Sequence, residues 1–300
     1  MARSDAMTSF NASASGTAFW NRRSVREGFR IWGGTLVLLA GAVVMMVPLA
    51  WMISTSLKAD GEVFLIPIRW IPSKILFSNY PAAVTFVPYM QFFANSIVVA
   101  ALSVGGAVLT SATVAFAFAR LRAPGRDILF LILLSTMMLP GEVTLVPTYL
   151  IFKDLGTLVT YWPLIVPSWL GGSAFYIFLL RQFFLTLPLE MDEAAKIDGA
   201  SLLGIFWRII LPLAKPGLAT VAIFAFFDRW NAFQAPLIYL NSMEKYTVPV
   251  GLRFYLSTMG NAHWNYLMAA TLIAIIPPIA IFFTTQRYFV EGAALTGIKG

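Results

Sequence analysis

The sequence predicts an all-α membrane protein with six transmembrane helices. The 300 residues are 59% hydrophobic and only 12% charged, with a mean hydropathy of +0.77, whereas a soluble domain carries about one quarter charged residues. Six apolar runs are long enough to cross a bilayer core, which takes roughly 20 helical residues. Because lipid offers no hydrogen-bond partners to a peptide backbone, these runs must be helices or irregular segments hidden inside a bundle.

The positions of the six runs predict the domain organisation. Residues 1–30 are polar and basic and form the expected cytoplasmic N-terminal tail. The first run spans 23 residues, longer than the roughly 7 to 15 apolar residues of a cleavable signal peptide, so we expect it to be retained. Residues 31–286 form the expected transmembrane domain, and residues 287–300 a cytoplasmic C-terminal tail. The six runs cover about 31–53, 92–119, 128–152, 161–180, 217–240 and 266–285.

The distribution of positive charge predicts the orientation of the helices. If the N-terminus is cytoplasmic, the cytoplasmic connections contain 14 lysines and arginines, and the outer connections contain 6. Positive residues gather on the cytoplasmic side of membrane proteins, so both termini are expected in the cytoplasm. Several spans also contain proline, as at Pro140 and Pro147. Each proline can kink its helix, although proline is also simply commoner in membrane helices than in soluble ones.

The longest cytoplasmic connection, about 184–215, is predicted to fold as two short helices that meet at a bend. Asp192 and Lys196 are spaced for an i,i+4 ion pair within the first helix. Gly199 is placed to end that helix through a left-handed residue, and Ser201 can cap the second helix. Pro212 is expected to stop the second helix.

Residues within this connection match a known pattern at full spacing: Glu193, Ala194, Ala195, Gly199, Ile209, Leu211 and Pro212. The pattern resembles the EAA loop of bacterial ATP-binding-cassette (ABC) importer permeases. The surrounding residues 196–201, and the later segments 227–240 and 244–252, are similar to the carbohydrate branch of that family, as in the six-span maltose-type permease. The resemblance covers nearly the whole chain from the first span.

The resemblance implies a permease subunit of the bacterial inner membrane that moves a sugar or sugar-like solute inward. The loop, including Lys196 and Asp198, would dock on two cytoplasmic ATPase subunits, which bind the ATP and magnesium, so this chain would carry no cofactor. A homologous second permease would complete the pathway. An extracytoplasmic solute-binding protein would deliver the solute and contact the outer connection at Tyr246, Arg253 and Tyr255.

Charged residues inside the spans are candidate solute ligands. An unpaired charge there costs at least about 2.5–3.5 kcal/mol, so Asp228 must face protein or water. Asp228, Trp230 and Asn231 could line the solute path. Alternatively, Asp228 could form a structural ion pair with the partner chain or simply lie nearer the outer surface. Adjacent helical residues do not face each other, so Asp228 is not expected to pair with Arg229. Glu142 could bind solute or take part in gating, or it could satisfy amides freed by a proline kink.

Composition and motifs exclude several other functions. The chain has no cysteine and a single histidine, so no metal site is expected. It lacks the phosphate-binding loop pattern G-x-x-x-x-G-K-[ST], so it is not expected to hydrolyse ATP. Without cysteine, with one histidine and with no carboxylate pair near a serine or metal cluster, it is not expected to be an enzyme of another kind. Its basic residues are scattered, which argues against nucleic-acid binding. An ion-coupled secondary transporter remains the alternative, because Glu142 and Asp228 are carboxylates within spans.

Overall fold

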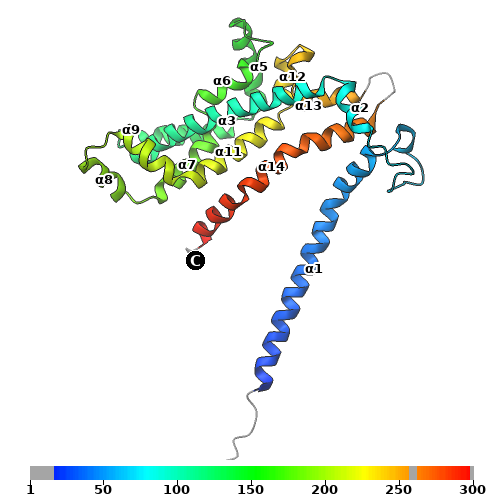
Figure 1. Cartoon of the computed structure of the whole chain (residues 1–300). Helices are drawn as coiled ribbons and strands as arrows, with labels where there is room; N and C mark the ends of the chain where they lie inside the picture. The colour runs from blue at the N-terminus through cyan, green and yellow to red at the C-terminus, as the bar shows by residue number, and fades with distance from the viewer. Residues whose placement is uncertain (1–16, 257–261, 298–300) are drawn as a thin grey trace, which may run out of the picture. The chain divides into compact units, whose positions relative to one another are not determined.

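The computed structural model describes residues 17–256 and 262–297, and side chains from residue 31 onward to residue 286 outside the same gap. All regular elements in these ranges are α-, 3₁₀- or π-helices, which confirms the predicted all-α fold. The chain falls into two compact units, Met1–Met52 and Ile53–Gly300. Each is described by itself below (Figure 1).

The first unit consists of the N-terminal part of α1 (Thr17–Ser56). The stretch from Ile31 onward is long and apolar enough to cross a membrane. Its large side chains are exposed on all sides, with Leu38 76% and Met45 80% exposed. A helix that is apolar around its whole circumference needs lipid or another protein as its surroundings.

The second unit is built around α3 (Tyr89–Arg120), which packs against α6 (Trp162–Trp169), α7 (Ala174–Thr186) and α11 (Lys215–Trp230). The α14 helix (Trp264–Gly297) packs on α11. Small residues of α3, such as alanine, serine and glycine, lie at these contacts. Small residues let helix backbones approach closely, which is how helices associate in lipid.

The helices provide between four and six possible membrane crossings. Four are long, apolar helical stretches, and two more arise if each of two bent helix pairs is one span. The first pair joins Arg126–Met138 to Gly141–Asp154 with a bend of 97°, and it breaks at the predicted Pro140. The second joins Leu202–Leu213 to Lys215–Trp230 with a bend of 79°. Each predicted run overlaps one of these, but the run 217–240 is wrong at its end, because α11 stops at Trp230 and α12 (Gln234–Tyr239) is a separate helix. Six crossings with both termini inside stays a prediction.

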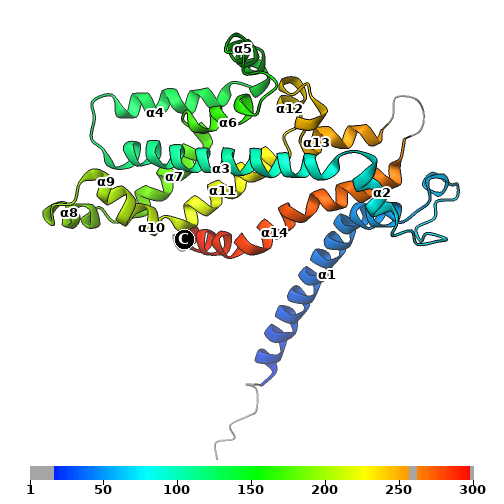
Figure 2. The same cartoon turned by 45° about the horizontal axis from the view of Figure 1, so that its top comes forward.

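Short helices lie at the two ends of the second unit. Both views place α8 and α9 at one end and α2 at the other (Figures 1 and 2). The predicted cytoplasmic and outer connections are therefore at opposite ends, as a spanning topology requires. The remaining elements are η1 (Asp60–Glu62), α2 (Asn79–Phe86), α4 (Arg126–Ser135), η2 (Thr136–Met138), α5 (Gly141–Asp154), α8 (Glu190–Ile197), α9 (Leu202–Ile205), the π-helix η3 (Phe206–Ile210), α10 (Leu211–Leu213), α12 (Gln234–Tyr239), η4 (Met243–Lys245), α13 (Val248–Gly251) and η5 (Leu252–Tyr255).

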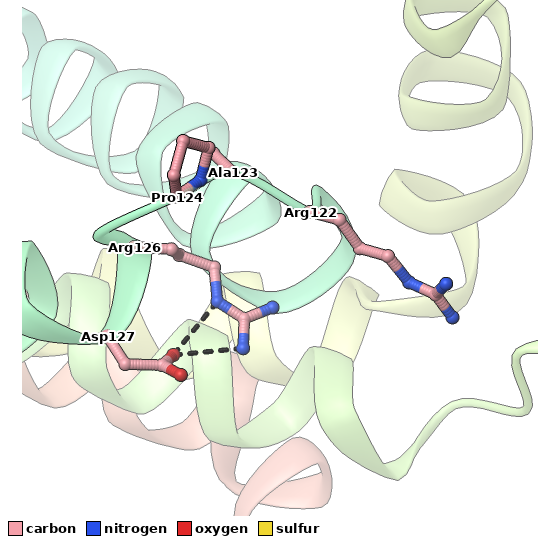
Figure 3. A pocket seen from close by; sticks show the side chains of 5 residues that line it. All are labelled: Arg122, Ala123, Pro124, Arg126 and Asp127. Carbon is pink, nitrogen blue, oxygen red and sulfur yellow. Dashed lines mark hydrogen bonds and ion pairs between the residues drawn. The ribbon is translucent and has the colours of Figure 1, made fainter.

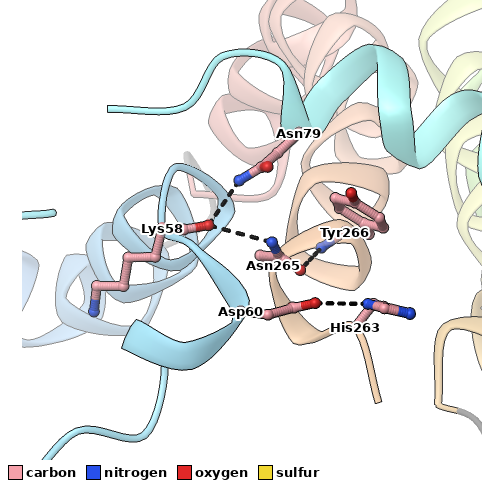
Figure 4. Close-up of polar contacts among 6 residues, drawn as sticks. All are labelled: Lys58, Asp60, Asn79, His263, Asn265 and Tyr266. Atoms are coloured by element: carbon pink, nitrogen blue, oxygen red, sulfur yellow. Dashed lines mark hydrogen bonds and ion pairs between the residues drawn. The ribbon is translucent and has the colours of Figure 1, made fainter. Parts of the chain in front are cut away.

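Polar contacts tie the end that carries α2 together. The carbonyl oxygen of Lys58 accepts hydrogen bonds from Asn79 at 2.8 Å and Asn265 at 3.2 Å (Figure 4). Asp60 Oδ2 lies 2.7 Å from His263 Nδ1. The contacts of Lys58 with Asn265 and of Asp60 with His263 join the segment after α1 to the start of α14, about 200 residues away in sequence. The Lys58 side chain is buried, and this burial lowers the pKa of its ammonium group.

Candidate functional site

The connection between α7 and α11 folds as the predicted pair of helices. We call residues 190–210, which comprise α8, α9 and η3, the coupling elbow. Gly199 adopts the left-handed conformation with φ of 80°, and the amide of Ala200 bonds the carbonyl of Ala195 at 2.9 Å, as in a glycine-terminated helix. Ser201 Oγ accepts a hydrogen bond from the Gly204 amide at 3.2 Å. The predicted roles of Gly199 and Ser201 in local structure are therefore confirmed.

The second helix of this connection does not end where the sequence predicts. Pro212 lies within α10, and the helical path continues to Leu213 before it breaks at Ala214 with φ −91° and ψ 12°. The prediction that Pro212 stops the helix is thus wrong. Pro212 sits at the start of α10, where a proline is tolerated because its missing N–H is not needed. The preceding turn is the π-helix η3, which is wider than an α-helical turn.

Asp192 pairs with a residue far away in the sequence. Its Oδ2 lies 3.3 Å from Arg120 Nε at the end of α3, and both side chains are at least 90% buried. Arg120 Nη2 also donates a hydrogen bond of 2.9 Å to the carbonyl of Leu187, just before α8. The predicted pair of Asp192 with Lys196 is therefore wrong, because Asp192 points toward α3 while Lys196 is exposed.

The predicted coupling residues divide into an outer and an inner face. Ala195 is buried in the cluster that contains Ile205 and Phe206 of the elbow and Phe116 of α3. Ile209 and Leu211 are half-buried. The other predicted residues are exposed on α8, at the bend after it or, for Pro212, in α10, and can meet another protein: Glu193, Ala194, Lys196, Asp198, Gly199 and Pro212.

Several apolar side chains of the elbow are exposed, and the sequence alone assigns no role to Ile197 or Trp207. Ile197 is 86% exposed, Leu203 69% and Trp207 55%. Leu203 and Trp207 line a groove of about 590 Å³ beside the Gly199 bend. Exposed apolar patches with polar surroundings are typical of protein interaction sites. Leu203 and Trp207 lie in the largely apolar stretch 202–211, where nothing in the sequence marks which side chains stay exposed.

A polar pocket of about 570 Å³ lies between the spans. It includes Asp228 and Arg229, whose Oδ2 and Nε are 3.7 Å apart, so the prediction that they do not pair is wrong. Both residues lie in the last turn of α11, which ends at Trp230. The Asp228 side chain is still 62% exposed. The other lining residues are Ala107, Thr136, Leu139, Gly141, Thr144, Ser168, Gly172, Ser173, Phe175, Tyr176 and Ala225.

The other three predicted pathway residues do not line this pocket. Trp230 is buried, and its Nε1 donates a hydrogen bond of 3.1 Å to the carbonyl of Ala274 in α14. Asn231 is exposed, and its amide bonds the carbonyl of Phe227 in the preceding turn. Glu142 is an exposed residue in the first turn of α5. The structure thus brings only Asp228 of the four to the pocket.

The predicted contacts for a binding protein also divide. Arg253 is exposed and Tyr246 is half-buried. Tyr255 is fully buried, and its hydroxyl donates a hydrogen bond of 2.7 Å to the carbonyl of Ala83. Burial raises the pKa of Tyr255. Its predicted role as a surface contact therefore does not fit this conformation, because its aromatic ring belongs to the core.

A shallow hollow of about 400 Å³ lies at the turn between α3 and α4. Arg126 Nη2 lies 2.9 Å from Asp127 Oδ1 there (Figure 3). Arg122 lines the same hollow and is exposed. Since Arg126 is paired with Asp127, the turn offers one arginine, Arg122, toward solvent and no enclosed site.

Comparison with known proteins agrees with this geometry. Residues 107–294 match the family described as "Binding-protein-dependent transport system inner membrane component". The sn-glycerol-3-phosphate transport system permease protein UgpE of Yersinia enterocolitica is 35% identical over 264 residues, which cover 86% of this chain and 93% of that protein. The probable ABC transporter permease protein YurM of Bacillus subtilis is 32% identical over 262 residues, which cover 86% and 85%.

A solved structure has the same fold. A chain in the crystal structure of a bacterial ABC transporter involved in the import of the acidic polysaccharide alginate superposes with a TM-score of 0.76 at 26% sequence identity. The match covers 87% of this chain and 98% of that one. The predicted resemblance to ABC importer permeases is confirmed. The chain therefore belongs to the family of binding-protein-dependent transport system inner membrane components, and it is a multi-pass permease of the bacterial inner membrane.

Proposed function

We propose that the chain moves a sugar or sugar-like solute inward, driven by ATP hydrolysis on separate subunits. The observation that carries this proposal is the coupling elbow, whose outer face is exposed while its inner face is packed and ion-paired to α3. Such an element can receive force from a docked protein and pass it to the spans. The proposed partners are two cytoplasmic ATPase subunits, which bind ATP and magnesium, a homologous second permease, and an extracytoplasmic solute-binding protein.

The exposed face of α8 is suited to docking in a groove of the ATPase. Ala194 and Gly199 present little side chain, which lets a second backbone approach closely. Glu193 and Lys196 supply opposite charges on that face for orientation. The apolar side chains of Ile197 and Leu203 add surface that binding would bury. These features support a tight protein contact at this end of the molecule.

The polar pocket is the proposed solute contact within this chain. Its hydroxyl groups and the Asp228 carboxylate can bond water, and they can bond the hydroxyl groups of a solute instead. The Phe175 ring offers an apolar face for a sugar ring. Relatives are named for the transport of sn-glycerol-3-phosphate and for the import of alginate, both polyhydroxylated compounds. This supports the sugar-like class, and the second permease would close the open side of the pocket.

Uptake by the reconstituted complex tests the proposed function against the ion-coupled alternative. The permease would be purified with its partners, placed in vesicles with binding protein and radiolabelled solute, and supplied with either internal ATP or a proton gradient. We expect uptake with ATP and none with the gradient alone, because the energy enters through the ATPase. Uptake driven by the gradient without ATP would instead establish a secondary transporter.

Asp228→Asn is expected to weaken transport without affecting the ATPase contact. Loss of a charged hydrogen-bond acceptor costs about 1.5–3 kcal/mol, so the apparent affinity for solute should fall roughly tenfold or more. The matched control is Asp127→Asn, because Asp127 also pairs with an adjacent arginine but lies outside the pocket. Uptake as a function of solute concentration measures the effect, and equal affinity in both variants would remove Asp228 from the pathway.

A further inference from the structure

We propose that α3 is the mechanical link between the ATPase and the outer connection, and that Arg120 is the positioning residue that attaches the coupling elbow to it. This inference rests on the proposed function and specifies which helix transmits the movement. It follows from contacts at the two ends and in the middle of one continuous helix.

The first set of contacts fixes the elbow to the C-terminal end of α3. Arg120, the last residue of that helix, holds α8 through Asp192 and holds the approach to α8 through the carbonyl of Leu187. The Phe116 ring lies 5.0 Å from the Phe206 ring, between their centroids. Arg120 thus contacts both α8 and the segment that leads into it, and the contact between Phe116 and Phe206 adds to this attachment. Breaking a buried ion pair by removing one partner leaves an uncompensated charge, so the arrangement resists separation.

The second set of contacts braces the middle of α3. The helix contains 32 residues and no proline, so it extends about 48 Å at 1.5 Å per residue. The Trp169 indole packs on Gly106, and its Nε1 donates a hydrogen bond of 3.0 Å to the carbonyl of Leu102. Thr110 Oγ1 lies 3.1 Å from the carbonyl oxygen of Ser168 and 2.8 Å from that of Gly106 in its own helix, so its one proton is shared between them. Ala107, between these braces, lines the polar pocket, so movement of α3 also moves the pocket wall.

The third set of contacts attaches α3 to the outer connection. Asn95 Nδ2 donates hydrogen bonds to the carbonyls of Glu244 at 2.8 Å and Tyr246 at 3.0 Å. Ser96 Oγ accepts a hydrogen bond of 2.8 Å from the Val248 amide. These backbone groups belong to the segment that precedes and begins α13, in the connection expected to meet the binding protein. Consecutive residues of α3 therefore hold the segment by three hydrogen bonds.

Other routes from the elbow into the membrane are interrupted. Toward α11, the chain passes through the π-helix and the break at Ala214, with a bend of 79°. Toward α6, α7 begins after Gly171 and Gly172, which have φ of 116° and 66°. Bends and left-handed residues absorb movement locally. Among the described helices that pack on the elbow, α3 offers the unbroken path.

The test places a fluorescent reporter at Glu244, in the segment bonded to the outer end of α3, and follows its response when the ATPase is trapped at the other end. Because the chain contains no cysteine, Glu244→Cys gives a single labelling site, at an exposed position, for an environment-sensitive fluorophore. The full complex in lipid is then trapped with magnesium, ATP and vanadate. We expect the fluorescence to change on trapping in the parent complex. We expect this change to be lost with Arg120→Gln or Asp192→Asn, while Arg122→Gln, an exposed arginine two residues on, retains it.

A second readout separates transmission from assembly. Stimulation of ATP hydrolysis by the binding protein should fall roughly 5- to 150-fold in the two elbow variants, the usual range for coupling between sites, with unstimulated hydrolysis retained. The double variant should be no worse than Arg120→Gln alone, because Arg120→Gln already removes the contact that Asp192→Asn breaks. Asn95→Ala leaves the elbow intact and should give the same loss of stimulation from the opposite end.

Two results would overturn the inference. Full fluorescence change and normal stimulation in Asn95→Ala and in elbow variants that still co-purify with the ATPase would show that α3 is not the link. A parent complex that neither binds an ATPase nor responds to trapping would refute the proposed function itself, and the inference with it.

Discussion

Gly199→Asp is expected to abolish ATP-dependent uptake while the protein remains in the membrane. Gly199 has φ of 80°, and this left-handed conformation costs a residue with a β-carbon roughly 1–2 kcal/mol of conformational energy. A β-carbon at this position would meet no atom within 4 Å, so the effect comes from backbone strain and the added charge rather than from a clash. The new carboxylate would stand beside Asp198 on the face proposed to dock with the ATPase. Two like charges at a protein contact oppose binding.

The measurements are uptake in vesicles, the amount of protein in the membrane fraction and co-purification with the ATPase. Gly125→Asp is the matched control, because Gly125 has φ of 78° and equally open surroundings but lies in the turn before α4. Glu193→Lys reverses a charge on the same exposed face of α8 and should also abolish uptake. Normal transport by both Gly199→Asp and Glu193→Lys would show that the elbow is not the coupling element.

Gly106→Ala is expected to destabilise the second unit by about 1–3 kcal/mol, the usual cost of overpacking. A β-carbon at Gly106 would lie 2.5 Å from Trp169 Cδ1 and Nε1. The indole cannot move aside freely, because Nε1 donates its hydrogen bond to the Leu102 carbonyl. The substitution must therefore displace the ring, break that bond or separate α3 from α6.

The neighbouring glycine provides the control for this prediction. A β-carbon at Gly105 would lie 4.0 Å from the nearest Trp169 atom, an ordinary contact, and alanine favours a helix by about 1 kcal/mol over glycine. Gly105→Ala should therefore leave stability unchanged or raise it. Thermal unfolding of the purified protein in detergent compares the two variants. Equal midpoints would indicate that the α3–α6 contact is looser than the structure shows.

The fold was largely predictable because it depends on local patterns. Runs of apolar residues gave the helical spans, and the left-handed Gly199 and the Ser201 cap followed from their positions beside predicted helices. These features depend on the residue's own backbone preference and on neighbours within a few positions. They can be recognised without knowledge of the tertiary structure.

Contacts between distant segments were not predictable in the same way. Asp192 had a suitable partner in Lys196 within its own helix, but packing placed it against Arg120, 72 positions earlier. The sequence predicts Tyr255 to be an aromatic residue of an outer loop, whereas its contact with Ala83 places its ring in the core. The polar pocket draws its lining from α3, η2, α5, α6, α7 and α11 and the joints between them. Its members share no spacing that a sequence pattern could reveal.

The wide turn of η3 also fixes the direction in which the following helix faces. A π-helical turn holds one residue more than an α-helical turn, and Phe206–Ile210 accommodates that extra residue just before α10 and α11. If this stretch tightened to α-helical geometry, α10 would rotate by about 100° about its own axis. Because α11 leaves α10 at a bend of 79°, the extra residue sets the direction in which α11 departs from the elbow.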